Sequence, residues 1–461
     1  MRVLLLELLL VSSLVGCGDN ELLAQPDASI ESPPDAPRDA PDSTLGPPLE
    51  ERINAAVDRI NGETCFTEPD TSECEWDDYE IRPAYFDMAV STNESILIID
   101  DFAEGTYPQF VRYRNRIRRF YSVDGQVLQP RDLSVRLPKR LGDSLAALAG
   151  PEFISASLLT AVGQAAGAVY SNVPLLFLGH GGVVFSHLVE LAPEQPLVLV
   201  HSAGLLKVLP SLCDGVTPQK LTDAAAHFES LASSLSGVIS ANDVKFINAS
   251  FGDTAQTLAT DWSQTCTTPL PSPEVVRQLL HLYDPVYSVL FNTAGVITAH
   301  AGANLGDPAD FPFDQPIQAY KNRVRVGFIS SKNSGLNEHG QGTVMKSKQF
   351  PRDGDADVYV NWNCVEFQGC GTPRYELAGA FGLGAFSVPL MSSSYVNPLG
   401  LGRLINLRYA AHDNEAMNDS LVQTLKQELT PAMCGQGNTQ KCVYQDPIPH
   451  GQLEVYRQGY R

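Results

Sequence analysis

Positive charge is scarce in this sequence. It has 32 lysines and arginines against 53 aspartates and glutamates, which gives a formal net charge of −21 at pH 7. Such a chain lacks the broad basic face that neutralises phosphates, so we expect no nucleic-acid partner. The one basic stretch lies within 112–140. We expect it to be a solvated face that offsets nearby acids, with an acidic binding partner as the alternative.

Long hydrophobic runs are absent beyond the N-terminus. Arg2 precedes a leucine-rich stretch that ends near Leu14, too short to span a bilayer as a mature helix and typical of a secretory signal peptide. It ends in Leu14-Val15-Gly16-Cys17, which resembles the bacterial lipoprotein box. We therefore expect residues 1–16 to be a lipoprotein signal peptide and Cys17 to be lipidated. The alternative is an ordinary signal peptide followed by a chance cysteine.

Large apolar residues are also rare in the next segment, 17–50, where Pro-Asp pairs recur at Pro26, Pro34 and Pro41. Such a segment cannot bury enough surface to offset the entropy lost on ordering. We expect a disordered tether, with one folded domain over 51–461. The protein would then be an exported bacterial cell-envelope lipoprotein, at the outer membrane or cell surface, attached to the membrane by its acyl chains alone.

Metal-binding patterns are missing as well. There is no Cys-x-x-Cys pair and no histidine at ligand spacing, so neither a zinc site nor any cofactor is expected. Without Cys17 eight cysteines remain, an even number that favours disulfides in an oxidising compartment. The sequence does not determine their connectivity. The simplest assignment pairs neighbours along the chain: Cys65 with Cys74, Cys213 with Cys266, Cys364 with Cys370, and Cys434 with Cys442.

Short apolar, β-rich runs alternate with helical-looking stretches along the remaining chain. We expect buried strands at Ser95–Asp100, 196–201, 243–250, 289–299 and 324–330. We expect helices at 145–163 (broken or restarted at Pro151), 222–236, 403–411 and 420–429. This alternation predicts an α/β fold with a mostly parallel sheet and helices on both faces. Polar residues just beyond strand ends build sites in such sheets, and Asp100, Ser250 and Asn304 have that position.

Five short signatures follow one another in a fixed order. They are Ile98-Ile99-Asp100, Gly179-His180-Gly181, Asn248-Ala249-Ser250-Phe251-Gly252, Gly302-Ala303-Asn304 and Gly384-Ala385-Phe386-Ser387-Val388-Pro389. This order resembles the subtilisin-like (S8) serine peptidases, over roughly residues 90–410. The resemblance implies a three-layer subtilisin-like fold in which Asp100 orients the base His180 and Asn304 donates to the oxyanion.

The resemblance also implies what the protein binds. Ser250, Phe251 and Gly252 match the family's strand that pairs with an extended peptide, so a polypeptide is the expected substrate or ligand. Calcium sites are common in the family, but no calcium-binding loop is legible in this sequence. The family pattern does not explain the long insertion at 103–178.

The nucleophile position decides the expected activity. The family's serine lies in Gly-Thr-Ser-Phe-Ser-x-Pro, four residues before the proline, and counting back from Pro389 gives Ala385. Alanine has no hydroxyl and cannot form an acyl-enzyme. Ser387 would lie on the opposite helix face, about 200° away, and Ser392, Ser393 and Ser394 about two turns further on. The sequence thus predicts a pseudopeptidase that binds polypeptide without cleaving it. The alternative is an active serine endopeptidase whose nucleophile lies elsewhere.

A different enzyme class is also compatible with one motif. Val200-His201-Ser202-Ala203-Gly204 resembles the nucleophile elbow of α/β-hydrolases, and His180-Gly181-Gly182 resembles their oxyanion motif. Val200 occupies the place of the first glycine, which the sharp turn requires to be small. Ser202 also lacks clear Asp and His partners in the expected order, although His300, His412 and His450 follow it. This hydrolase is the third hypothesis.

Overall fold

The computed structural model describes only part of the chain. The described residues are 48–67, 73–87, 93–102, 107–150, 152–171, 180–302, 307–314, 320–329, 356–361, 379, 381–383, 393–429 and 444–445. The predicted signal peptide, Cys17 and nearly all of the predicted tether lie outside them. Contacts divide the chain into 1–46 and 47–461, and every element below belongs to the second unit. No helix in the described part has the length and apolar character needed to cross a bilayer.

The elements up to the middle of the chain are α1 (Leu49–Asn61), β1 (Trp76–Ile81), β2 (Ser95–Asp100), α2 (Gln109–Arg112), β3 (Ile117–Asp124), β4 (Val127–Arg131), β5 (Leu133–Pro138), α3 (Lys139–Ala147), α4 (Thr160–Val169), α5 (His180–Leu191), β6 (Leu197–His201), α6 (Pro218–Ala241) and β7 (Val244–Ala249). Those that follow are α7 (Ala255–Thr265), α8 (Pro273–Leu280), α9 (Asp284–Asn292), β8 (Ile297–Ala301), β9 (Arg323–Ile329), β10 (Val358–Asn361), α12 (Ser393–Ala411), α13 (Asp419–Leu429) and β11 (Tyr444–Gln445). Helix α1 already begins at Leu49, inside the segment predicted to be a tether.

The main sheet of the described residues has nine strands in the order β11-β10-β9-β8-β7-β2-β6-β3-β4. All neighbouring pairs are parallel except β3 and β4, which form an antiparallel hairpin at one edge. Parallel strands need crossover connections; α6 connects β6 to β7, and α7, α8 and α9 connect β7 to β8. The predicted α/β fold with a mostly parallel sheet is confirmed.

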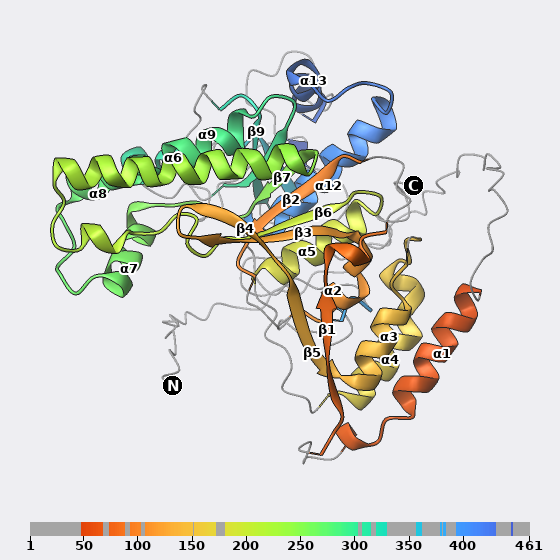
Figure 1. Ribbon diagram of the computed structural model, residues 1–461. Coiled ribbons are helices and arrows are strands. Elements are labelled where there is room, and N and C mark those ends of the chain that lie inside the picture. The colour runs from red at the N-terminus through yellow and green to blue at the C-terminus, as the bar shows by residue number, and fades with distance from the viewer. Residues whose placement is uncertain are drawn as a thin grey trace, which may run out of the picture. The chain divides into compact units, whose positions relative to one another are not determined.

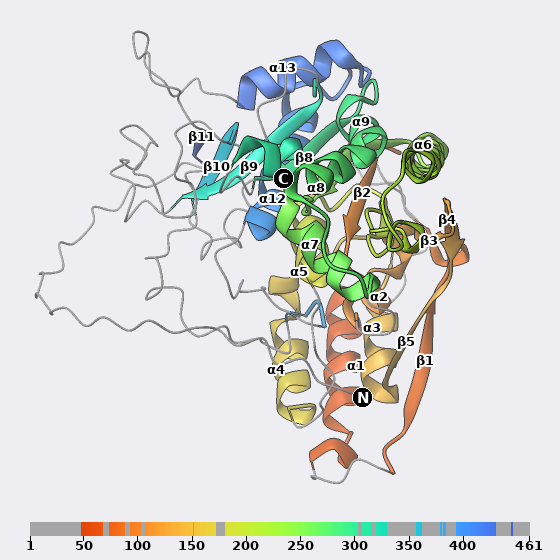
Figure 2. The same ribbon diagram turned by 90° about the vertical axis from the view of Figure 1, so that its left-hand side faces the viewer.

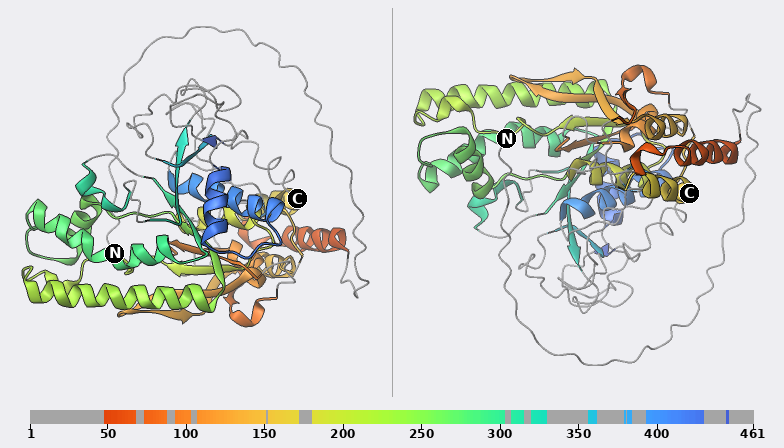
Figure 3. Two further views of the ribbon diagram at one scale, coloured as in Figure 1. Left: turned by 90° about the horizontal axis from the view of Figure 1, so that it is seen from above. Right: turned by 90° about the horizontal axis from the view of Figure 1, so that it is seen from below.

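Strand β2 lies in the interior of this sheet because both of its faces are apolar. All six of its residues are buried. Ile96 and Ile98 face one hydrophobic core, which includes side chains of α5 and α12, while Leu97 and Ile99 face a second core formed with α6, α8 and α9. Figures 1 and 3 show these two groups of helices on opposite sides of the strands. The result is a three-layer arrangement.

Two predicted elements differ from the structure. The predicted strand 289–299 contains the end of α9, and the strand β8 begins only at Ile297. The helix predicted over 145–163 is two helices, α3 and α4, so the expected break at Pro151 is confirmed, but α3 begins earlier and α4 ends later than predicted. A short apolar run has the same appearance in a buried helix and in a buried strand, so composition alone could not separate α9 from β8.

The insertion between Asp100 and His180 has a clear structural role. It supplies β3 and β4 to the main sheet, and its next strand, β5, pairs antiparallel with β1 from the segment before β2. Helix α1 packs against α3 and α4 of the insertion. Figure 2 shows these helices and the β1–β5 pair side by side. The N-terminal segment and the insertion therefore form one substructure.

The basic stretch is divided between the surface and the interior: Arg119, Arg131 and Arg136 are exposed, whereas two other arginines are buried. Arg112 and Arg116 are only 2% and 4% exposed. Arg112 donates to the carbonyls of Ile154 and Gly382, and Arg116 donates to those of Ala192 (2.8 Å) and Gln195 (3.0 Å). The expectation of a solvated face was therefore wrong for Arg112 and Arg116, whereas the exposed Arg131 and Arg136 do pair with acids, Asp124 at 3.0 Å and Asp78 at 3.4 Å. A guanidinium carries five donors and can join several backbone segments at once.

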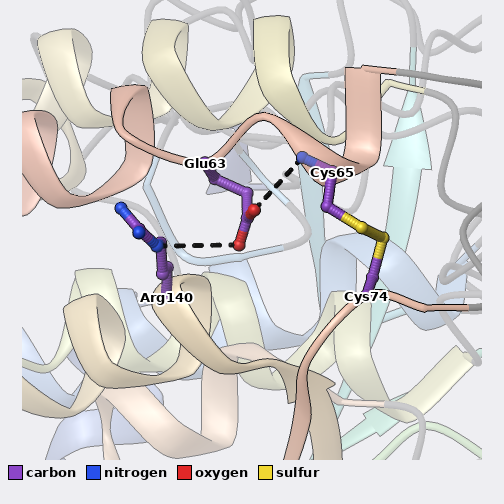
Figure 4. Close-up of a disulfide and its surroundings, with 4 residues drawn as sticks. All are labelled: Glu63, Cys65, Cys74 and Arg140. Atoms are coloured by element: carbon purple, nitrogen blue, oxygen red, sulfur yellow. Dashed lines mark hydrogen bonds and ion pairs between the residues drawn. A yellow bond between two sulfur atoms is a disulfide. The ribbon is translucent and has the colours of Figure 1, made fainter.

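Two of the four predicted disulfides lie among the described residues. Cys65 is bonded to Cys74, and Cys213 to Cys266. Near the first bond, Glu63 accepts a hydrogen bond from the Cys65 backbone and lies 3.9 Å from the Arg140 guanidinium (Figure 4). The other four cysteines, at 364, 370, 434 and 442, lie outside the described residues.

Removal of a described disulfide should reduce stability more when the bond closes a longer loop, with a logarithmic dependence on loop length. The bonds span 9 and 53 residues, and chain-entropy arguments give about 3 and about 4 kcal/mol respectively. We expect Cys213→Ala/Cys266→Ala to lower the free energy of unfolding more than Cys65→Ala/Cys74→Ala, measured by guanidinium titration. A larger loss from the shorter loop would contradict this ranking.

Candidate active site

Two of the three polar residues predicted at strand ends, Asp100 and Ser250, do lie at one edge of the sheet. In the parallel register, Asp100 at the end of β2 is paired with His201 at the end of β6. On the other side Ile99 is paired with Ala249, the last residue of β7, so Ser250 follows at the same edge. Two helices, α5 and α12, pack against this part of the sheet. Carboxyl ends of parallel strands are where α/β proteins place their sites.

Asp100 and His180 form the centre of this edge. The Nδ1 atom of His180, the first residue of α5, lies 2.6 Å from Oδ1 of Asp100. The same carboxylate oxygen accepts from the Asp101 backbone N–H at 2.7 Å. The Asp100 side chain is 2% exposed, whereas the imidazole is 32% exposed. The structure thus holds a histidine by a buried carboxylate and leaves part of its ring accessible from outside.

The pKa of His180 is raised above its ordinary 6.5. Burial lowers this pKa, but the hydrogen bond to Asp100 and the charges of Asp100 and Asp101 outweigh burial. Burial also raises the pKa of the Asp100 carboxyl, an effect that the hydrogen bond from His180 opposes. The imidazole is therefore a stronger base than a histidine in water.

A glycine lets α5 approach β2 closely enough for this contact. A Cβ placed on Gly181 would lie 2.7 Å from the Asp101 carbonyl oxygen and 2.8 Å from the Phe102 ring. Real Cβ atoms do not come this close to backbone oxygens. The sequence predicted Gly181 only as part of a motif. The structure gives a steric reason for a glycine at this position.

Ser394 in the first turn of α12 is joined to Ser250 by two hydrogen bonds. The Ser250 hydroxyl donates to the Ser394 carbonyl at 2.9 Å, and the Ser394 hydroxyl donates to the Ser250 carbonyl at 3.3 Å. The helix would ordinarily satisfy the Ser394 carbonyl with the amide of residue 398. Pro398 has no N–H, so this carbonyl is left for Ser250. The proline therefore connects α12 to the end of β7.

A buried amide strengthens the same connection. Asn397, also in α12, donates from Nδ2 to Oδ1 of Asn248 and to the Ala299 carbonyl, both at 3.0 Å. Asn248 and Ala299 lie on the neighbouring strands β7 and β8. Hydrogen bonds from one buried amide to two strands favour one arrangement of the elements they join. The first turns of α12 are thereby held against the carboxyl ends of these strands.

The residue after Ser394 brings this turn to the imidazole. The ring of Tyr395 packs on His180 with 5.1 Å between ring centroids and an interplanar angle of 35°. From the sequence, Ser394 was expected about two turns beyond the nucleophile position and no better placed than Ser387. The structure shows that α12 begins at Ser393, so Ser394 lies in its first turn, next to the Tyr395 that packs on His180.

A signal for Ser394 was present in the sequence. The spacing that pointed to Ala385, four residues before a proline, occurs a second time with Ser394 and Pro398. Ala385, Ser387 and Pro389 lie outside the described residues, as does Asn304. The structure therefore does not test the assignments of Ala385 and Asn304.

The residues considered for a hydrolase elbow have other partners. The Ser202 backbone N–H donates to the Asp100 carbonyl at 2.8 Å. His300 is buried and bonds the Phe251 carbonyl through Nε2 at 2.9 Å, and burial lowers its pKa to about 3. His412 bonds Glu415 and Glu428, and His450 lies outside the described residues. No contact among the described residues joins His300 or His412 to Ser202.

Potential metal ligands do not cluster in the part of the chain that the structure covers. No group of three or more His, Cys, Asp or Glu side chains there could hold an ion. The donors at the site are instead one carboxylate, one imidazole and hydroxyl groups. This set suits proton transfer and nucleophilic chemistry.

The fold and the site define an α/β protein with a carboxylate–histidine pair and a helix-borne serine at the carboxyl edge of a parallel sheet. No protein family's sequence profile matches the chain, and no curated protein matches it. Among solved structures it is similar to one titled "Structure of Prenylagaramide maturation protease PagA", with 12% identity over 81% of this chain and 95% of that chain. The TM-score of 0.30 is too low for this similarity to carry an argument.

The close approach at Gly181 predicts a specific sensitivity. We expect Gly181→Ala to lower the free energy of unfolding by about 1–3 kcal/mol, because its Cβ would displace the Asp101 carbonyl or the Phe102 ring. The matched control is Gly237→Ala in α6, where a Cβ meets nothing within 4 Å. In Gly237→Ala the free energy of unfolding should rise by about 0.5–1 kcal/mol. Equal effects of the two substitutions in guanidinium titrations would show that steric crowding at Gly181 does not determine stability.

Proposed function

We propose that this protein is a serine peptidase of the subtilisin-like type, with Ser394 as nucleophile, His180 as general base and Asp100 as the residue that orients the base. The observation that carries the proposal is the position of α12, whose first turn holds Ser394 and stacks Tyr395 on His180. The order Asp, His, Ser along the chain and the serine four residues before Pro398 support the subtilisin-like assignment.

The proposed chemistry follows from the hydrogen bonds of His180. Asp100 accepts from Nδ1, so Nε2 is the nitrogen that can take a proton. As the Ser394 oxygen attacks a peptide carbonyl carbon, its proton passes to Nε2. The imidazolium then protonates the leaving amine as the C–N bond breaks, and an acyl-enzyme remains. Water, deprotonated by the same nitrogen, releases the acid and restores the serine.

The surroundings supply the other requirements. The first amides of a helix have no intrahelical acceptor and carry partial positive charge. The N-terminus of α12 can therefore stabilise the oxyanion formed at Ser394, and Asn304 is proposed as the side-chain donor. The segment from Ser250 to Gly252, which extends β7, is proposed to pair with an extended polypeptide substrate.

Cellular location is a further part of the proposal. The leucine-rich N-terminus and the Cys17 box favour an exported lipoprotein with a lipid anchor on Cys17. The two described disulfides fit an oxidising compartment. A peptidase on such a tether would act on polypeptides outside the cytoplasm.

A fluorophosphonate probe tests the nucleophile directly. The probe forms a bond between the attacking serine oxygen and phosphorus as fluoride leaves, and digestion with mass spectrometry identifies the labelled residue. We expect labelling at Ser394, abolished in Ser394→Ala and reduced by about 10³-fold or more in His180→Ala. Ser202→Ala should label at the wild-type rate, and Ala385→Ser should show no increase.

Other outcomes separate the rival hypotheses. Labelling at Ser202 would identify the hydrolase elbow as the nucleophile. Absence of labelling in the folded protein, with labelling gained in Ala385→Ser, would establish the pseudopeptidase and Ala385 as its vacant nucleophile position. Either result overturns the assignment of Ser394.

The raised pKa of His180 predicts the pH dependence of labelling. The base must be neutral, so the rate should rise with pH through a pKa above 6.5. Asp101→Asn removes an exposed negative charge that favours the imidazolium, so the pKa of His180 should fall. The acidic limb of the labelling rate should then move to lower pH, and the shift should be smaller at high salt. The control Asp58→Asn on α1 removes the same charge elsewhere and should not move the limb. A shift to higher pH in Asp101→Asn would contradict this sign.

A further inference from the structure

Tyr395 has a contact that the proposed chemistry does not yet use. Its ring centroid lies 5.1 Å from that of the His180 imidazole, with the two planes 35° apart. Tyr395 comes from α12, whereas His180 begins α5, and the two helices pack against each other. The tyrosine directly follows Ser394, so the helical turn that carries the proposed nucleophile also packs an aromatic ring against His180.

Two acidic residues and one aromatic residue surround His180, and they come from different segments of the chain. Asp100, from β2, bonds Nδ1, and the charge of Asp101 comes from the segment after β2. A single hydrogen bond to Nδ1 fixes one atom of the imidazole but leaves rotation about that contact. A ring packed against the imidazole restricts this rotation, because turning the imidazole would open a gap or cause a clash.

We propose that Tyr395 is a positioning residue that holds the His180 imidazole in its working orientation and stabilises it when it is protonated. This inference rests on the proposed function of the site. An aromatic face attracts a cation within about 6 Å of its centroid. In the active form of the site His180 is neutral at rest and becomes cationic when it takes the proton of the nucleophile, so the aromatic ring favours the transition state over this resting form.

The two variants Tyr395→Leu and Tyr395→Phe separate the ring from its hydroxyl. Leucine fills part of the space but has no π face, whereas phenylalanine keeps the ring. We expect Tyr395→Leu to slow fluorophosphonate labelling of Ser394 by roughly tenfold, and Tyr395→Phe to remain within about twofold of wild type. The acidic limb of the labelling rate should move to lower pH in Tyr395→Leu only, because the imidazolium loses stabilisation.

A second readout does not depend on labelling. NMR titration of protein with isotope-labelled histidine, with the His180 signal assigned by its loss in His180→Gln, gives the pKa of the imidazole in each variant. We expect this pKa to fall in Tyr395→Leu and to stay at the wild-type value in Tyr395→Phe. Thermal unfolding of all variants checks that they remain folded.

The outcomes distinguish this inference from the proposed function. If wild-type Ser394 is not labelled but the His180 pKa falls in Tyr395→Leu, the peptidase proposal fails and the aromatic contact stands as a property of the pair. If Ser394 is labelled and Tyr395→Leu changes neither rate nor pKa, the role of Tyr395 is overturned. Equal losses in Tyr395→Phe and Tyr395→Leu would overturn it too, since the hydroxyl would then be the essential group.

Discussion

The hydrogen bond between Asp100 and His180 is the constraint on which the rest of the site depends. A carboxylate that is 2% exposed loses its hydration, and its burial is tolerable only if it is bonded. The imidazole is 2.6 Å away and belongs to a different element, so the N-terminus of α5 must come directly to the end of β2. Gly181 makes that approach sterically possible, and Arg116 bonds the carbonyl of Ala192 just beyond the other end of the helix.

The second half of the site depends on α12. Pro398 interrupts the hydrogen bonds of its helix at the Ser394 carbonyl, and the freed oxygen accepts from Ser250 on the sheet. A residue that ordinarily weakens a helix here joins that helix to a strand end. The Asn397 side chain bonds two neighbouring strands at the same place. These contacts bring the Ser394 turn to an imidazole held by elements more than 200 residues earlier in the chain.

Much of the fold could be predicted because its pattern is local. Strand β2 is continuously apolar and ends in an acid, and β6, β7, β9, α6 and α13 lie where apolar runs or helical spacing indicated. The prediction failed where local pattern is ambiguous, as at the junction of α9 and β8. It also failed for Arg112 and Arg116, since charged residues are rarely buried and their carbonyl partners are distant in sequence. In the site, Asp100 and His180 were found by order and spacing, but two prolines carry the same spacing and sequence reasoning chose Pro389.

By itself, the sequence determined the α/β architecture, the buried central strand and the candidate acid and base. These properties depend on hydrophobic periodicity, turn residues and the order of polar residues, all of which are local features of the sequence. Only the tertiary structure decided which disulfides form among the described cysteines, which helix turn packs on His180, and what the insertion and its buried arginines do. The physical reason is that a helix start and the partner of a freed carbonyl are settled by packing between distant segments, and spacing along the chain does not contain that information.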